Sequence, residues 1–118
     1  MYDEAVRSYK KSIELNPGYA PAYKNLALVY LGQGIVDEAV SCLEKSIELG
    51  LADSSTYFYL SVAYEKQGMI DTAASNYKKT IELNPSQAEL KEIYLRLGTI
   101  CFDKQQLNKA IEYLKKVL

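Results

Sequence analysis

The chain has 118 residues, with 14 Lys plus Arg, 15 Asp plus Glu, two Cys and no His. A share of 48% hydrophobic and 25% charged residues is typical of one globular unit and excludes disordered and fibrous chains. The formal net charge of -1 lacks the basic excess that nucleic acid or an anionic membrane usually requires, so we expect neither as a partner. Without histidine, His-based catalytic triads and zinc proteases are also excluded.

The two cysteines give no sign of a metal or redox site. Cys42 and Cys101 lie 59 residues apart and belong to no Cys-x-x-Cys motif. We expect both to be small core side chains, with a disulfide between them as the alternative. So low a cysteine content favours a reducing, cytoplasmic compartment. Apolar stretches such as 26–31 are far shorter than the ~20 residues of a membrane helix.

An internal repeat organises the whole chain. Ile-Glu-Leu occurs at 13–15, 47–49 and 81–83, each 34 residues after the last. The same step relates many other positions, among them Ala5, Ala39 and Ala73; Tyr9, Leu43 and Tyr77; Tyr23 and Tyr57; Tyr30 and Tyr64; Gly34 and Gly68. After residue 85 the register slips by three, so that Ala110 lies 37 residues beyond Ala73.

The apolar spacing within each complete unit predicts two helices. Residues 1–17 contain one helix, which matches only the second half of a unit. Complete helix pairs then follow at 20–53, 54–87 and 88–118. Gly34 and Gly68 separate the helices of the first two pairs, and Asn-Pro or Gly-Leu pairs end the second helices. The sequence therefore predicts an all-α protein of seven helices.

Two kinds of helix start are predicted. Asp37, Asp71 and Asn108 lie near the starts of second helices, where a side-chain oxygen could accept from free main-chain amides. The segment from Ser86 to Glu89 reads as a capping box, in which the serine and the glutamate each bond the other's main-chain amide. This box predicts that the first helix of the last pair begins about one turn early.

The combined spacing resembles the tetratricopeptide repeat, Trp-x-x-Leu-Gly-x-x-Tyr followed by Ala-x-x-x-Phe and Pro over 34 residues. Matching residues in one unit are Tyr23, Leu26, Ala27, Tyr30, Ala39 and Leu43. Tyrosine replaces the usual Trp in all three complete units. The resemblance implies a right-handed α-solenoid of antiparallel helix pairs, with a concave groove lined by the first helix of each pair. It also implies a binding scaffold without a cofactor, a metal or catalytic residues.

Mapping that groove onto this chain gives nine candidate residues, three from each complete unit: Lys24, Asn25, Leu28, Phe58, Tyr59, Val62, Leu95, Arg96 and Thr99. Apolar side chains flanked by one Lys and one Arg favour a peptide with apolar anchors and an acidic group. The alternative is that the two aromatic residues merely fill space between helices and that the two cations are solvated.

Two subgroups of the family are disfavoured by particular residues. One subgroup binds the C-terminal carboxylate of chaperones through two Lys, two Asn and one Arg. In this chain Leu28, Tyr59 and Glu92 occupy three of those five positions. We therefore expect no binding of chaperone tails. Glycosyltransferase-associated arrays repeat an asparagine in every unit, but only Asn25 matches it.

The ends of the array lack neighbours. The first helix, with Ala5, Val6, Tyr9 and Ile13, has no partner of its own, and the last ends at Val117 and Leu118 without a capping helix. We expect the chain to be a fragment of a longer array and to associate with itself end to end.

The sequence thus predicts a non-catalytic scaffold that binds a peptide segment of another protein. Two alternatives stay open: the recognition arm of a larger enzyme such as a glycosyltransferase, and a structural module that assembles through its ends. No Gly-rich phosphate loop or activated nucleophile occurs in the chain.

Overall fold

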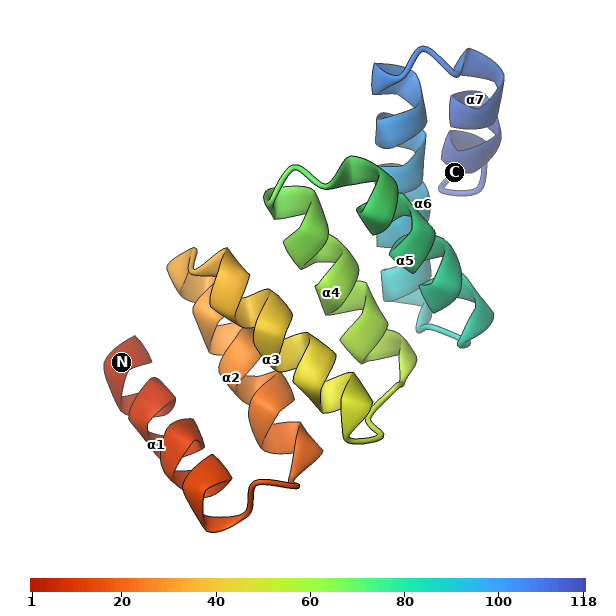
Figure 1. Ribbon diagram of the computed structural model, residues 1–118. Helices are drawn as coiled ribbons and strands as arrows, with labels where there is room; N and C mark the ends of the chain where they lie inside the picture. Colours follow the sequence, from red (N-terminus) through yellow and green to blue (C-terminus); the bar gives the residue numbers. More distant parts are fainter.

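The computed structural model describes residues 1–118 and consists of seven α-helices that follow one another from one end of the molecule to the other (Figure 1). They are α1 (Tyr2–Leu15), α2 (Ala20–Gln33), α3 (Val36–Glu48), α4 (Ser54–Lys66), α5 (Ile70–Glu82), α6 (Gln87–Asp103) and α7 (Leu107–Lys115). The molecule measures 50 × 25 × 22 Å, and its radius of gyration is 15.3 Å. A compact domain of this length would have about 13.5 Å, so the array is elongated.

Neighbouring helices pack as sequential antiparallel pairs, and the predicted all-α class and helix number are confirmed. The helices α2, α4 and α6 each pack against the helix before and the helix after them. In addition α2 contacts α4, and α4 contacts α6, whereas α3, α5 and α7 do not contact one another. The array therefore bends toward α2, α4 and α6, which form its inner layer. The exact unit boundaries at 20, 54 and 88 stay a prediction.

The core consists of two clusters rather than one, as expected where each unit buries its apolar face only against its neighbours. The first cluster lies between α2, α3 and α4 and the second between α5 and α6. Alanines at the helix crossings are completely buried, among them Ala27, Ala39, Ala63 and Ala73. Cys101 is buried and Cys42 packs against the first cluster; both are free thiols, so the alternative disulfide does not form.

The turns inside the helix pairs require a left-handed backbone. Gly34 has φ of 79° and Gly68 has φ of 82°, as the sequence indicated. The third turn places Gln105 in the same conformation, with φ of 62°. A side chain with a Cβ is strained there, because the Cβ crowds the backbone.

The predicted capping box is confirmed. The Glu89 amide donates to Ser86 Oγ and the Ser86 amide to Glu89 Oε1, both at 3.1 Å. Helix α6 has 17 residues where α2 has 14 and α4 has 13, so the extra turn is present. The structure has no helix with the length and apolar character needed to cross a bilayer.

The prediction that Asp37, Asp71 and Asn108 cap helices was wrong. None of α3, α5 and α7 has a side-chain cap. Asp37 instead accepts a 2.8 Å hydrogen bond from Gln67 Nε2, and Asp71 pairs with Lys104. Each link joins the first turn of an outer helix to the C-terminal end of the next inner helix. The two aspartates are therefore used to hold consecutive units together.

Replacing Gln105 with Gly should raise the free energy of unfolding by about 1 kcal/mol, because glycine tolerates the left-handed conformation without a Cβ clash. Urea denaturation followed by circular dichroism measures the change. The matched control is Gly68→Ala, which introduces a Cβ into open space at the equivalent turn and should lower stability by about the same amount. A Gln105→Gly variant that is less stable than wild type would contradict this account.

Replacing Ser86 with Ala should cost about 1 kcal/mol of stability, because the α6 amide at Glu89 loses its acceptor. Thermal denaturation of this variant is compared with that of Ser41→Ala, an exposed serine of α3 that forms no side-chain hydrogen bond. Equal melting temperatures for the two variants would show that the box does not stabilise α6.

Candidate functional site

The nine predicted groove residues lie on the three inner helices, three on each of α2, α4 and α6. Most are half-buried; Leu95 and Thr99 are exposed. Because α2, α4 and α6 are consecutive neighbours on the side toward which the array bends, these residues can share one surface. We call this surface, from Lys24 to Thr99, the inner surface. Whether it binds a ligand stays a prediction.

The aromatic residues in the middle of the inner surface also belong to the core. Phe58 and Val62 pack against the second cluster, and Tyr59 packs against the first. The Phe58 and Tyr59 rings are in edge contact with centroids 5.5 Å apart, and the Phe58 and Tyr77 ring centroids are 6.3 Å apart. These side chains thus fill space between helices, and only their uncovered parts can contact a ligand.

Lys24 lies close to Asp53, the N-cap residue of α4. Its ammonium lies 3.8 Å from Asp53 Oδ1, and that oxygen also accepts from the Thr56 hydroxyl at 2.6 Å and from the Thr56 amide at 2.9 Å. Partial burial acts to raise the pKa of Asp53, but the hydrogen bonds from Thr56 and the charge of Lys24 lower the pKa below its usual value. Asp53 is therefore an ionised cap of α4 with Lys24 beside it.

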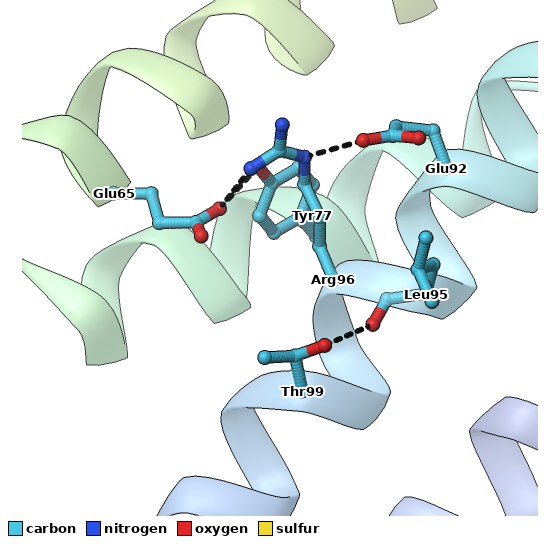
Figure 2. Close-up of polar contacts among 6 residues, drawn as sticks. All are labelled: Glu65, Tyr77, Glu92, Leu95, Arg96 and Thr99. Carbon is cyan, nitrogen blue, oxygen red and sulfur yellow. Dashed lines mark hydrogen bonds and ion pairs between the residues drawn. The ribbon is translucent and has the colours of Figure 1, made fainter.

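Arg96 is held between two carboxylates (Figure 2). Its Nε donates to Glu92 Oε1 at 2.9 Å within α6, and Nη1 donates to Glu65 Oε1 at 3.1 Å across to α4. The Tyr77 hydroxyl donates to the same Glu65 oxygen at 2.7 Å. These four residues, here called the Arg96 network, connect α4, α5 and α6 at the inner surface. Their formal charge is -1, so the network presents no free cation.

Tyr77 is the buried member of the network, with no exposed surface. Burial raises the pKa of the Tyr77 phenol, and the hydrogen bond to Glu65 and the charge of that carboxylate raise the pKa further. The phenol therefore stays neutral and continues to donate to Glu65. The pairing of Glu65 with Tyr77 and with Arg96 could not be read from the sequence, because it joins residues 12 and 31 positions apart.

The most exposed apolar side chains on the inner surface or next to it lie on α6. Leu95 is 44% exposed and Phe102 is 60% exposed. Thr99 lies between them, and its hydroxyl donates to the Leu95 carbonyl at 3.0 Å. Residues at i, i+4 and i+7 share one helix face, so Leu95, Thr99 and Phe102 form an exposed strip. Sequence reasoning missed Phe102, although its spacing from Leu95 could have identified it.

The residues predicted at the ends of the array differ in exposure. Ala5, Val6, Tyr9 and Ile13 of α1 are half-buried, as is Val117, while Leu118 is exposed. Larger exposed apolar side chains occur near them, including Tyr2 and Leu15 on α1 and Leu107 and Ile111 on α7. The end helices therefore expose apolar side chains among charged ones, and end-to-end contact stays a prediction. The structure contains no group of three or more side chains placed to hold a metal ion.

Replacing Tyr77 with Phe removes the hydroxyl that donates to Glu65 and should lower the free energy of unfolding at pH 7 by about 1 kcal/mol. The phenol of an unfolded chain titrates near pH 10. Because the pKa of Tyr77 is higher when folded, the unfolded state binds fewer protons above about pH 10, and wild-type stability falls as the pH rises. The variant should show a shallower fall in melting temperature from about pH 9 to 11.

The control for this pH series is Tyr19→Phe, which removes an exposed phenol. It should retain the wild-type slope, because it leaves the Tyr77 hydroxyl and its hydrogen bond to Glu65 in place. Identical slopes for Tyr77→Phe and wild type would contradict the assigned role of the Tyr77 hydroxyl.

Comparison with known proteins identifies the repeats. Family models match over most of the chain: TPR repeat at residues 1–34, and tetratricopeptide repeat at 20–49, 55–86 and 91–118. No curated protein sequence matches the chain.

Solved structures match the whole array. A crystal structure of MamA aligns with a TM-score of 0.88 at 27% identity, covering 98% of this chain and 66% of that one. MamA from Desulfovibrio magneticus RS-1, from residue 41 to its end, gives 0.86 at 24% identity, with 98% and 64% covered. YrrB, a TPR protein with an unusual peptide-binding site, gives 0.84 at 23% identity, with 98% and 58% covered.

This chain thus spans about two thirds of the MamA structures and less of YrrB. The likeness to YrrB and to the D. magneticus protein, below 25% identity, concerns the fold alone. Family models, helix order and fold agree with one another, and the chain is a tetratricopeptide repeat protein.

Proposed function

We propose that this chain is a non-catalytic scaffold whose inner surface binds a peptide segment of another protein. Tetratricopeptide repeats are associated with protein–protein interaction. The observation that carries the proposal here is the exposed strip of Leu95, Thr99 and Phe102 on α6, next to the Arg96 network. Large apolar side chains exposed together beside fixed polar groups are typical of a binding surface.

The strip favours a short apolar anchor on the ligand. Leu95 and Phe102 are seven residues apart along α6, which corresponds to about 10 Å of helix. Two apolar side chains of a ligand can span that length, one at each end of the strip. Thr99 is a poor donor for the ligand, since its hydroxyl already bonds the Leu95 carbonyl. Affinity would then come mainly from burying the two apolar side chains.

The charges of the inner surface favour a ligand different from the one that the sequence indicated. From the sequence, we expect an acidic group of the peptide to pair with Lys24 or Arg96. Arg96 is bonded to two carboxylates, and Lys24 lies near Asp53. An acidic ligand group near α6 would meet Glu65 and Glu92, whereas a basic group would be attracted to them. We therefore propose a peptide that combines apolar anchors with a basic residue.

This arrangement also supports the expectation that chaperone tails are not ligands. A C-terminal carboxylate would have to displace Glu65 or Glu92 from Arg96, leaving that glutamate without its partner. YrrB, which has the same fold, carries a peptide-binding site, so the architecture is compatible with the proposed ligand class.

The test is a peptide-library screen followed by titration of the selected peptide. Replacing Leu95 and Phe102 together with Ala should weaken binding at least about tenfold, or about 1.4 kcal/mol, because both anchors lose their contact surface. Fluorescence anisotropy with a labelled peptide measures the dissociation constant.

The matched control replaces Leu107 and Ile111 of α7 with Ala, which removes exposed apolar surface of similar size away from the inner surface. Its affinity should stay within about twofold of wild type. Equal affinity of the Leu95 and Phe102 variant and wild type would contradict the proposed site, and loss of binding in the α7 variant would place the site at the end of the array.

A further inference from the structure

A hollow of 280 Å³ lies between α5, α6 and α7, and it is the only pocket in the structure. Residues that line it include Leu97 and Cys101 of α6 and Lys104, which directly follows this helix. At 100° per residue, Leu97 and Lys104 lie about 160–180° around the helix axis from Leu95, and Cys101 lies about 120° from it. None of the residues that line the hollow belongs to the exposed strip or to the Arg96 network, so the hollow is separate from the proposed peptide site.

The hollow exists because the two outer helices are separated. Helices α5 and α7 both pack on α6 but do not contact each other. The inner helix is consequently left uncovered between them. Its side chains Leu97, Ile100 and Cys101, which are otherwise buried, form an apolar floor.

The rim of the hollow is cationic. Lys78 of α5, Lys104 directly after α6 and Lys109 of α7 line it, with Asp71 as the one acidic residue. Asp71 pairs with Lys104, whereas Lys78 and Lys109 form no ion pair. The local charge is therefore +2 in a chain whose net charge is -1.

Polar neutral groups complete the lining. The side chains of Ser75, Gln106 and Tyr113 also border the hollow and offer hydroxyl and amide donors. A site with an apolar floor, two unpaired ammonium groups and neutral donors is complementary to a molecule that has an apolar body and one anionic head.

We propose that this hollow binds a small amphiphilic carboxylate, with its aliphatic body on Leu97, Ile100 and Cys101 and its carboxylate between Lys78 and Lys109. The volume is close to the lower end of small-molecule sites, about 300 Å³, so the body is limited to a short chain. The carboxylate stays at the rim, where water screens the charges, so binding weakens as the salt concentration rises.

The probe is 4-methylpentanoate, titrated into ¹⁵N-labelled protein and followed by two-dimensional NMR. Saturable shifts are expected for amides of α5, α6 and α7 that border the hollow. Two control ligands separate the contributions of the apolar body and of the charge to binding. 4-Methylpentanamide has the same body without the charge, and acetate has the charge without the body. Each control ligand should bind at least about fivefold more weakly than the probe.

Two double variants test the role of the rim cations, and both remove two positive charges, one from α5 and one from α7. Lys78→Gln with Lys109→Gln removes the two rim ammonium groups and should weaken binding at least about fivefold. Lys79→Gln with Lys115→Gln removes the same charge from α5 and α7 at residues that do not line the hollow, and it should bind as wild type. Ser75→Leu narrows the hollow without changing charge and should also weaken binding.

The proposal is overturned if the amide binds as tightly as the carboxylate, if the two double variants lose affinity equally, or if no saturable shifts occur in wild type. Shifts centred on Leu95 and Phe102 would place the probe at the inner surface instead. The spectra of each variant show directly whether it is folded, and Ser75→Leu provides a test that does not depend on the lysine variants.

Discussion

Close approach of neighbouring helices is the constraint on which this array depends. At the crossing of each pair the inner helix contributes a small residue, Ala27, Ser61 or Gly98, and each is buried. At Gly98 a Cβ would lie 2.8 Å from the Leu114 side chain of α7, which would have to shift to make room. The outer helix of each pair contributes an alanine such as Ala39. Because these positions recur with the repeat, the same pair geometry recurs, and the chain becomes an elongated stack with two small cores instead of one large core.

This geometry creates two unlike surfaces on one helix. The inner helices contact one another, so α6 meets α4 on the inside and contributes Arg96 to a network with Glu65. The outer helices do not contact one another, so the side of α6 that carries Leu97 and Cys101 is left partly uncovered between α5 and α7. The exposed strip and the hollow thus have a common origin in the curvature of the array. They differ in charge: acidic groups surround Arg96, whereas unpaired Lys78 and Lys109 border the hollow.

Polar contacts join each of the first two complete helix pairs to the next pair. Asp37 with Gln67 and Asp71 with Lys104 are equivalent pairs that tie an outer helix to the end of the next inner helix. Such exposed contacts contribute little stability individually. They are directional, however, and so favour one placement of a pair against the next. An apolar core alone constrains this relation less, because burial is not directional.

The sequence by itself determined the helices, their number, the glycine turns and the early start of α6, since these depend on local spacing and on caps such as Ser86 that act within one turn. It also indicated that Leu95 and Arg96 share a surface with residues of other units. Tertiary structure alone decided which charges pair between helices, that Tyr77 donates to Glu65, and that α5 and α7 leave a hollow. The polar pairs among these features join residues 12 or more positions apart. Their geometry is set by how whole helices pack, which a repeat pattern does not specify.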